Sequence, residues 1–209
     1  MSAVRRRSAQ AEARAESQRE RILDAAQKCF VEQGFHGASM AAIAETADMS
    51  AGLMYRYFES KNAIMLAIIA RELEGKRAKI EELYTDADFP AKVLEKFRLW
   101  QTGSAGVMNA ALFLEMSAEA TRAPEMARAI RTSDTLTRTD FERWLRRGRE
   151  EGGLGLPEDV ARARGVLMQC VIEGLVVRAA RDPEFDAEIL GEALEPLFRL
   201  MGFESPAPP

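Results

Sequence analysis

Residues 21–69 contain three helix signatures of decreasing length, separated by turn residues, and then the start of a fourth helix. Ser39, Ser50 and Ser60 each precede an apolar segment, and a serine hydroxyl at such a position caps the first turn of a helix. The third segment ends in Tyr55-Arg56-Tyr57-Phe58 and is too short to be stable alone. Its neighbours must therefore hold it in place, while its polar side chains face a partner outside the core.

This pattern predicts a helix-turn-helix, in which the second helix of the motif enters the major groove of DNA. Met54 and Phe58 are predicted to pack onto the first helix, whose apolar stripe recurs at spacings of three and four residues. The outward-facing residues of the third helix are then Ser50, Ala51, Gly52, Leu53, Arg56 and Tyr57. Tyrosine hydroxyls and the ammonium of Lys61 are suitable donors to phosphate oxygens.

The composition favours helices and excludes a generally basic surface. The 209 residues carry a net charge of −4, and stretches rich in β-branched residues are rare. Residues 1–70 nevertheless hold nine Lys/Arg against eight Asp/Glu, so a DNA-binding surface must be a local patch in this part of the chain. The start of the chain lacks the apolar stretch of a secretory signal, and no apolar run is long enough to span a membrane. Two cysteines, Cys29 and Cys170, are expected to be buried thiols of a cytoplasmic protein.

Turn residues divide the chain into about nine predicted helices without strands, so the predicted fold class is all-α. Residues 1–16 are expected to be a disordered basic arm, with the first helix starting near Ser17. The helix-turn-helix domain is predicted over residues 17–62. A helical ligand-binding and dimerisation domain follows over residues 63–203, and residues 204–209 form a mobile tail.

The segment from the first to the fourth helix resembles the DNA-binding domain of the tetracycline-repressor (TetR/AcrR) family of bacterial regulators. The residues that carry the resemblance are Gly34-Phe35, Ser39, Ile43-Ala44, Ala47, Ser50, Gly52, Tyr55, Tyr57-Phe58 and Ser60-Lys61. The resemblance implies a homodimeric, all-α transcription regulator, expected to be a repressor of a palindromic operator. It also implies DNA contacts from Met40, Ala51, Gly52, Tyr55, Arg56, Tyr57 and Lys61. Ser39 and Ser50, the predicted caps, are further candidate DNA-binding residues.

Two residues depart from the family pattern. Asp48 stands in the turn where the family often has glycine, and aspartate tolerates the left-handed backbone conformation that such a turn needs. Leu53 stands where the family often has a polar residue, and leucine contacts a thymine methyl group rather than forming a hydrogen bond to a base.

The second domain carries large adaptable side chains that suit either a core or a ligand pocket between helices. These residues are Phe97, Trp100, Met108, Phe113, Met116, Trp144 and Met168, with Glu115 and Glu173 as polar anchors. Their apolar character predicts a hydrophobic or amphipathic small-molecule effector, and the two glutamates allow a cationic one.

Two apolar stripes near the carboxy terminus predict a dimer interface made of four helices. One stripe holds Leu167, Val171 and Leu175, and the other holds Ile189, Ala193 and Leu197. Two-fold symmetry of the protein would match the symmetry of a palindromic operator.

Two other classes of function compete with this interpretation. A filled second domain would favour a ligand-independent DNA-binding or partner-binding protein. A helical enzyme is disfavoured, since the chain has one histidine and no pattern for a nucleophile, a cofactor or a metal site.

Overall fold

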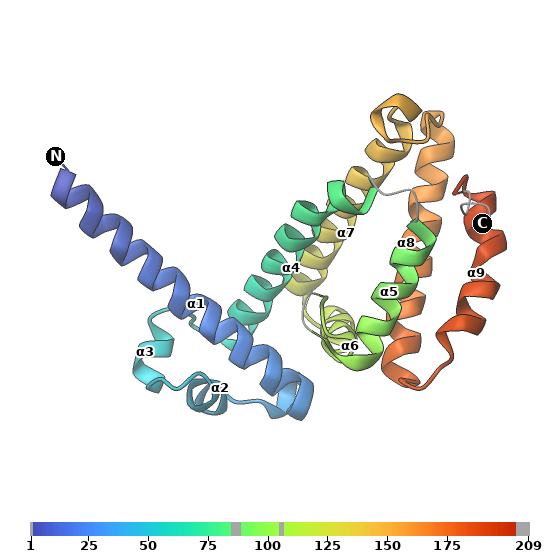
Figure 1. Ribbon diagram of the computed structural model, residues 1–209. Helices are drawn as coiled ribbons and strands as arrows, with labels where there is room; N and C mark the ends of the chain where they lie inside the picture. Colours follow the sequence, from blue (N-terminus) through green and yellow to red (C-terminus); the bar gives the residue numbers. More distant parts are fainter. Residues whose placement is uncertain (1, 85–88, 105–106, 204–209) are drawn as a thin grey trace.

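The computed structural model describes residues 2–84, 89–104 and 107–203. Over these ranges the chain forms nine α-helices and one short 3-10 helix, without strands, which confirms the predicted all-α class (Figure 1). The helices are α1 (Ser2–Gly37), α2 (Met40–Thr46), α3 (Ala51–Tyr55), α4 (Lys61–Tyr84), α5 (Phe89–Thr102), α6 (Ala110–Ala120), α7 (Pro124–Arg146), α8 (Glu158–Arg181) and α9 (Ala187–Leu200), with the 3-10 helix η1 (Arg149–Glu151) after α7. No described helix is both long and apolar enough to cross a membrane.

Helices α1, α2 and α3 lie together at one end of the molecule, and α4 leads from them into the carboxy-terminal bundle (Figure 1). Within that bundle α5 packs against both α8 and α9, while α7 packs against α4 and α8. The predicted domain boundary between residues 62 and 63 falls in the first turn of α4, so one continuous helix joins the two parts.

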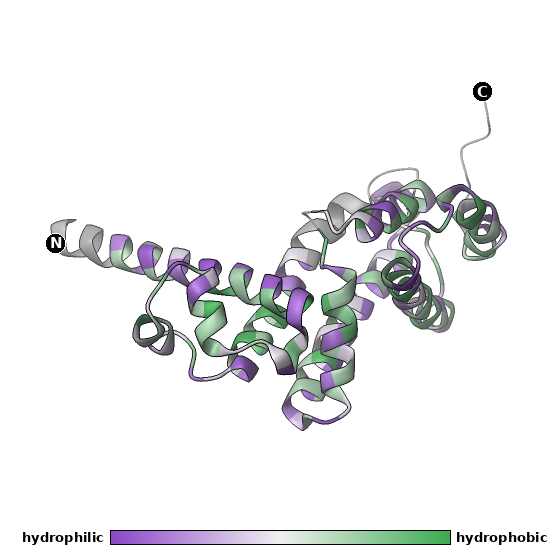
Figure 2. Cartoon of the chain, turned by 90° about the horizontal axis from the view of Figure 1, so that it is seen from below, coloured by the Kyte–Doolittle hydropathy of each residue, from purple (hydrophilic) through white to green (hydrophobic). Residues whose placement is uncertain are grey.

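The amino-terminal helix is longer than predicted. Residues 1–16 were expected to be a disordered arm with a helix start at Ser17, but α1 begins at Ser2. The reason is local, because the segment before Gly34 contains neither glycine nor proline and is rich in alanine, arginine and glutamate. Where Figure 2 colours the projecting part of α1, hydrophilic residues alternate with hydrophobic ones. The predicted tail at 204–209 lies outside the described residues.

The buried apolar residues form two clusters, here called the first core and the second core. The first core holds Ile22, Leu23, Ala25, Ala26, Cys29, Phe30, Phe35, Ala38, Ile43, Ala44, Ala47, Met54, Phe58, Ile64, Met65, Ile68, Ile69, Leu112, Met116 and Met126. Because Leu112, Met116 and Met126 come from α6 and α7, the core of the helix-turn-helix continues into the second domain.

The second core is rich in aromatic side chains. It holds Phe89, Val93, Phe97, Trp100, Ala110, Phe141, Trp144, Leu145, Ala161, Met168, Leu175, Val176, Ala179, Ala187, Phe198, Met201 and Phe203. The rings of Phe89 and Phe203 are stacked with centroids 4.4 Å apart, and Trp144 stacks on Phe203 at 5.7 Å. The indole N–H of Trp144 donates to the carbonyl of Gly152 at 2.9 Å, so the one polar group of this side chain has a hydrogen-bond partner.

The two cysteines differ in burial. Cys29 lies in the first core, as predicted, and its Sγ is 3.3 Å from the hydroxyl of Thr46. Cys170 was expected to be buried, but it is exposed on α8. Met168 and Val171 near it in the sequence pack into or against the second core, but Cys170 lies on another face of α8.

The end of α1 is shaped by Gly34, whose φ of 72° and ψ of 162° interrupt the helix. This backbone conformation is essentially restricted to glycine. The interruption frees backbone groups that other helices then satisfy. Lys61 at the start of α4 donates its ammonium to the carbonyls of Phe35 at 2.7 Å, His36 at 3.2 Å and Ala38 at 2.6 Å.

The N–H of Phe35 is satisfied from the other side. It donates to a carboxylate oxygen of Glu115 on α6 at 2.8 Å. Next to it, the Nε2 of His36 lies 3.0 Å from a carboxylate oxygen of Glu119, also on α6. The end of α1 is therefore tied to both α4 and α6.

Replacement of Gly34 by alanine should reduce stability, since alanine is strained at this positive φ. We expect Gly34→Ala to lower the free energy of unfolding by about 1–3 kcal/mol, measured by urea denaturation. Gly75→Ala is the matched control. Gly75 lies within α4, and a methyl group added there would meet nothing within 4 Å, so alanine should add about 0.5–1 kcal/mol. Equal effects of the two substitutions would contradict the assigned role of Gly34.

Replacement of Lys61 by methionine keeps an aliphatic side chain but removes the three donated hydrogen bonds. We expect Lys61→Met to cost about 1.5–3 kcal/mol of stability, which is typical for hydrogen bonds that involve a charged group. Lys28 is exposed on α1, and Lys28→Met should change stability by less than about 0.5 kcal/mol. A melting temperature of Lys61→Met equal to that of the wild type would refute the capping role.

Candidate nucleic-acid interface

Helices α2 and α3 each have a serine as the N-cap residue. The hydroxyl of Ser39 accepts the N–H of Ala42 at 3.1 Å, and the hydroxyl of Ser50 accepts the N–H of Leu53 at 3.2 Å. Both predicted N-caps are therefore confirmed. The capping bonds fix where each short helix begins, and so they fix which residues of α3 face outward.

The turn between α2 and α3 has the conformation that the sequence predicted. Asp48 has a φ of 51°, in the left-handed region where glycine is common in such turns. Arg21 on α1 donates to the carbonyls of Ala47 at 2.5 Å and Asp48 at 3.2 Å. The turn is thus held to α1 from outside the motif.

Helix α3 has one buried side and one open side. Met54 is completely buried and Phe58 is nearly so, both in the first core, as predicted. Ser50, Ala51 and Gly52 are exposed, and a methyl group added to Gly52 would meet nothing within 4 Å. The amino-terminal residues of α3 are therefore accessible to a DNA base edge, with Leu53 half-buried beside them.

The two tyrosines after this turn differ in an unexpected way. The side chain of Tyr55 is open to solvent, with 55% of its surface exposed. Tyr57 is half-buried and packs against the first core, while Arg56 between them is exposed. Burial therefore increases from the end of α3 at Tyr55 toward Phe58, which lies in the first core.

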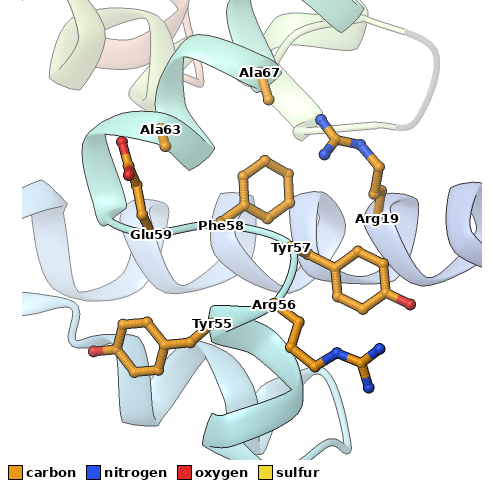
Figure 3. Close-up of a pocket in the computed structure, with 8 residues that line it drawn as sticks. All are labelled: Arg19, Tyr55, Arg56, Tyr57, Phe58, Glu59, Ala63 and Ala67. Atoms are coloured by element: carbon orange, nitrogen blue, oxygen red, sulfur yellow. The ribbon is translucent and has the colours of Figure 1, made fainter.

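A hollow of about 420 Å³ adjoins these residues and also includes Arg19, which no sequence pattern indicated (Figure 3). The hollow is lined by Arg19, Tyr55, Arg56, Tyr57, Phe58, Glu59, Ala63 and Ala67. Arg19 comes from α1, and its guanidinium carbon lies 4.6 Å from the centroid of the Phe58 ring. With a helix start predicted at Ser17, Arg19 falls in the first turn of the helix, where a side chain has no well-defined position. For this reason the sequence did not indicate Arg19 as a site residue.

Two predicted DNA contacts are in different positions from those expected. The ammonium of Lys61 donates to three carbonyls at the end of α1, so it is not directed at a phosphate, and its assignment as a phosphate ligand is corrected. Met40 is half-buried and packs against the first core. The hydroxyl of Ser39 remains exposed at the start of α2.

The predicted ligand residues are divided between the two cores. Phe97, Trp100, Trp144 and Met168 are buried in the second core, against which Phe113 packs. Met116 belongs to the first core, and Met108 packs against that core. None of these residues lines the hollow beside α3 or the one between α1 and the segment before α6. They were grouped by residue type and helical spacing, which do not reveal which of two cores a side chain joins.

The two predicted polar anchors already have partners within the chain. Glu115 accepts the N–H of Phe35 and therefore links α6 to α1, which corrects its assignment as a ligand anchor. Glu173 accepts a hydrogen bond from the side-chain amide of Gln169 at 2.9 Å, one helical turn away on α8.

The predicted dimer residues fall into three groups. Leu167, Ile189 and Ala193 are exposed, while Val171 and Leu197 are partly buried against the second core. Leu175 is buried within that core, so its assignment to the interface is wrong for this arrangement. Val166 and Leu200, which are 47% and 73% exposed, add apolar surface to the same two helices.

Comparisons with known proteins agree with this architecture. Residues 22–68 match the family model described as bacterial regulatory proteins, tetR family. Residues 104–196 match the model described as BetI-type transcriptional repressor, C-terminal. The first match covers the helix-turn-helix and the second covers most of the carboxy-terminal bundle.

Two relatives share part of the sequence. The HTH-type transcriptional regulator UidR of Escherichia coli K12 is 35% identical over 127 residues, which make up 61% of this chain and 63% of UidR. The HTH-type transcriptional repressor KstR of Mycolicibacterium smegmatis is 40% identical over 63 residues, or 30% of this chain and 31% of KstR. The alignment with UidR therefore spans less than two thirds of that relative.

Solved structures resemble the chain over most of its length. GusR of Salmonella enterica has a TM-score of 0.65 and 26% identity, over 88% of this chain and 96% of GusR. A putative transcriptional regulator from Saccharomonospora viridis in complex with choline has a TM-score of 0.70 and 18% identity, over 88% of this chain and 96% of its own. From its helix-turn-helix and from these matches, the chain belongs to the tetR family of bacterial regulatory proteins.

Proposed function

We propose that this chain is a cytoplasmic, ligand-responsive transcriptional repressor that binds a near-palindromic operator as a homodimer. The observation that carries the proposal is the exposed amino-terminal half of α3, held by a buried Met54 and Phe58 and flanked by Arg56 and two tyrosines. A short rigid helix with this arrangement suits the major groove, where base edges are read.

The residues of the interface fall into those that contact base edges and those that contact the phosphate backbone. Ala51, Gly52 and Leu53 approach base edges, and Leu53 favours a thymine methyl group. Tyr55, Arg56 and Tyr57 stand at the end of α3, where hydroxyl and guanidinium donors bind phosphate oxygens or a guanine edge. Ser39 and Ser50 lie at the starts of α2 and α3 and add contacts to the phosphate backbone.

The dimer forms through α8 and α9. Exposed leucine, isoleucine and valine side chains on these two helices make an apolar surface that a monomer would leave in water. A methyl group added to Gly174 of α8 would meet nothing within 4 Å, so a partner helix has room to approach closely there. A second copy of the chain satisfies both features in a two-fold arrangement.

A hydrophobic or amphipathic effector binds the carboxy-terminal bundle. Since the aromatic side chains of the second core are packed against one another, an effector must separate some of them as it enters. Rings such as Phe89, Trp144 and Phe203 are also suited to a cation, because an aromatic face attracts a quaternary ammonium group. The choline complex of the Saccharomonospora viridis regulator makes such compounds the first to test.

Binding is communicated through α6. This helix contributes Leu112 and Met116 to the first core, and its Glu115 and Glu119 contact Phe35 and His36 at the end of α1. A shift of α6 would therefore move α1 and change the spacing between the two α3 helices of a dimer. An effector favours release only if it binds the shifted arrangement better than the operator-bound one.

A ligand-independent DNA-binding protein is the second candidate function. The second core favours it, because its aromatic side chains are buried and stacked on one another. The two candidates differ in one measurable respect, namely whether any small molecule releases the protein from DNA.

Selection from a library of random-sequence duplexes tests the function. We expect the wild-type protein to enrich a sequence with two inverted half-sites, whose centres lie about 34–36 Å apart or a multiple of that distance. A panel of hydrophobic amines and quaternary ammonium compounds is then added to the selected complex. Release of DNA supports the effector-responsive function, and failure of the wild type to enrich any sequence would overturn the proposal.

A charge at position 189 should disrupt the dimer. Ile189 is 58% exposed on α9, so Ile189→Glu should leave the monomer folded but shift the protein from dimer to monomer. Light scattering combined with gel filtration measures the mass. The control Thr135→Glu places the same charge on an exposed position of α7 and should remain dimeric. A monomeric wild-type protein at micromolar concentration would exclude this interface.

A further inference from the structure

The hollow next to α3 joins α1 to the helix-turn-helix. Its residues come from α1, the end of α3, the connection to α4 and the first turns of α4. Figure 3 shows the ring of Tyr57 between the guanidinium groups of Arg19 and Arg56. Arg19 therefore stands beside the residues expected to contact DNA, although it belongs to a helix outside the motif.

Arg19 is held in place by an apolar contact rather than by an acidic partner. Its guanidinium carbon lies 4.6 Å from the centroid of Phe58, which is itself almost fully buried. Within the described part of the chain, Arg19 makes no hydrogen bond or ion pair. In Figure 3 the carboxylate of Glu59 points toward Ala63, away from Arg19. The result is a half-buried cation with its N–H donors unused.

The charge of the hollow is opposite to that of the whole chain. Arg19 and Arg56 contribute two positive charges and Glu59 one negative charge, while the whole chain has a net charge of −4. The positive charge of this hollow, next to the exposed helix α3, is complementary to the negative charge of a polyanion. The ring of Phe58 in its wall restricts the side-chain conformations of Arg19 before a ligand binds.

We propose that Arg19 binds a backbone phosphate of DNA, so that α1 contacts DNA alongside α2 and α3. The proposal rests on the DNA-binding function proposed above. A guanidinium can donate two parallel N–H bonds to the non-bridging oxygens of one phosphate, and the hydroxyl of Tyr57 is a further donor at the same wall of the hollow. Phosphates are the same at every base pair, so this contact contributes affinity and orientation without reading sequence.

The contact predicts a specific signature in the salt dependence of binding. Each phosphate neutralised by a protein cation adds about 0.9 to the slope of log affinity against log salt concentration. We expect Arg19→Gln to weaken binding about tenfold at 0.15 M salt and to lower that slope by about 0.9, both for the duplex selected by the wild type and for a mixed-sequence duplex of equal length. Arg19→Lys, which keeps the positive charge, should retain most of the slope.

The controls separate this contact from general effects. Arg149→Gln removes an equal charge from η1, which lies at the far end of the bundle in Figure 1, and should leave affinity and slope unchanged. Thermal melting of each variant identifies loss of folding. An unchanged slope for Arg19→Gln would overturn the phosphate contact, including the case in which affinity falls together with the melting temperature. If the wild type selects no duplex at all, the proposed function fails instead.

Discussion

The end of α1 is the point on which the arrangement of the molecule depends. Gly34 breaks the helix, and the carbonyls and N–H groups released by the break are satisfied by Lys61 of α4 and Glu115 of α6. Buried backbone groups without partners are costly, so these bonds specify where both helices must lie. Two charged side chains of opposite sign thus fix the helix-turn-helix against the rest of the chain, one through carbonyls and one through an N–H.

This junction also explains how rigidity and movement coexist in a small regulator. The helix-turn-helix is internally well fixed, since its two short helices have serine caps and Arg21 holds the turn between them. Its connection to the bundle includes the continuous helix α4, polar contacts at the end of α1 and the shared first core. Shifts of whole helices across such a junction are the usual way in which one site influences another.

Local sequence patterns predicted much of the fold. The serine caps, the turn at Asp48 and the buried Met54 and Phe58 follow from rules that act over a few residues, and the sequence predicted each of them. The helical amino terminus was missed because polar composition was read as disorder, although alanine, arginine and glutamate are also good helix formers. The exposure of Cys170 depends on the far side of α8, about which its apolar neighbours in the sequence carry no information.

The candidate site was harder to predict, since long side chains can serve either structure or binding. Lys61 and Glu115 were selected for their charge, and both are used by backbone groups more than twenty residues away in the sequence. Arg19 was overlooked because its ring contact with Phe58 joins residues that are distant in sequence. Tyr55 is exposed and Tyr57 packs against the first core, a difference that residue type alone does not reveal.

The shared first core has a consequence for the modular use of such regulators. Leu112 and Met126 belong to the carboxy-terminal half of the chain, yet they are completely buried among residues of the helix-turn-helix. A hybrid in which the first sixty residues are joined to the bundle of another regulator would therefore place side chains of that regulator inside the first core. To exchange DNA specificity, only the exposed residues of α3 should be replaced, and the buried contacts with α6 and α7 should be kept. The residues to exchange are then chosen by their packing and not by their position along the sequence.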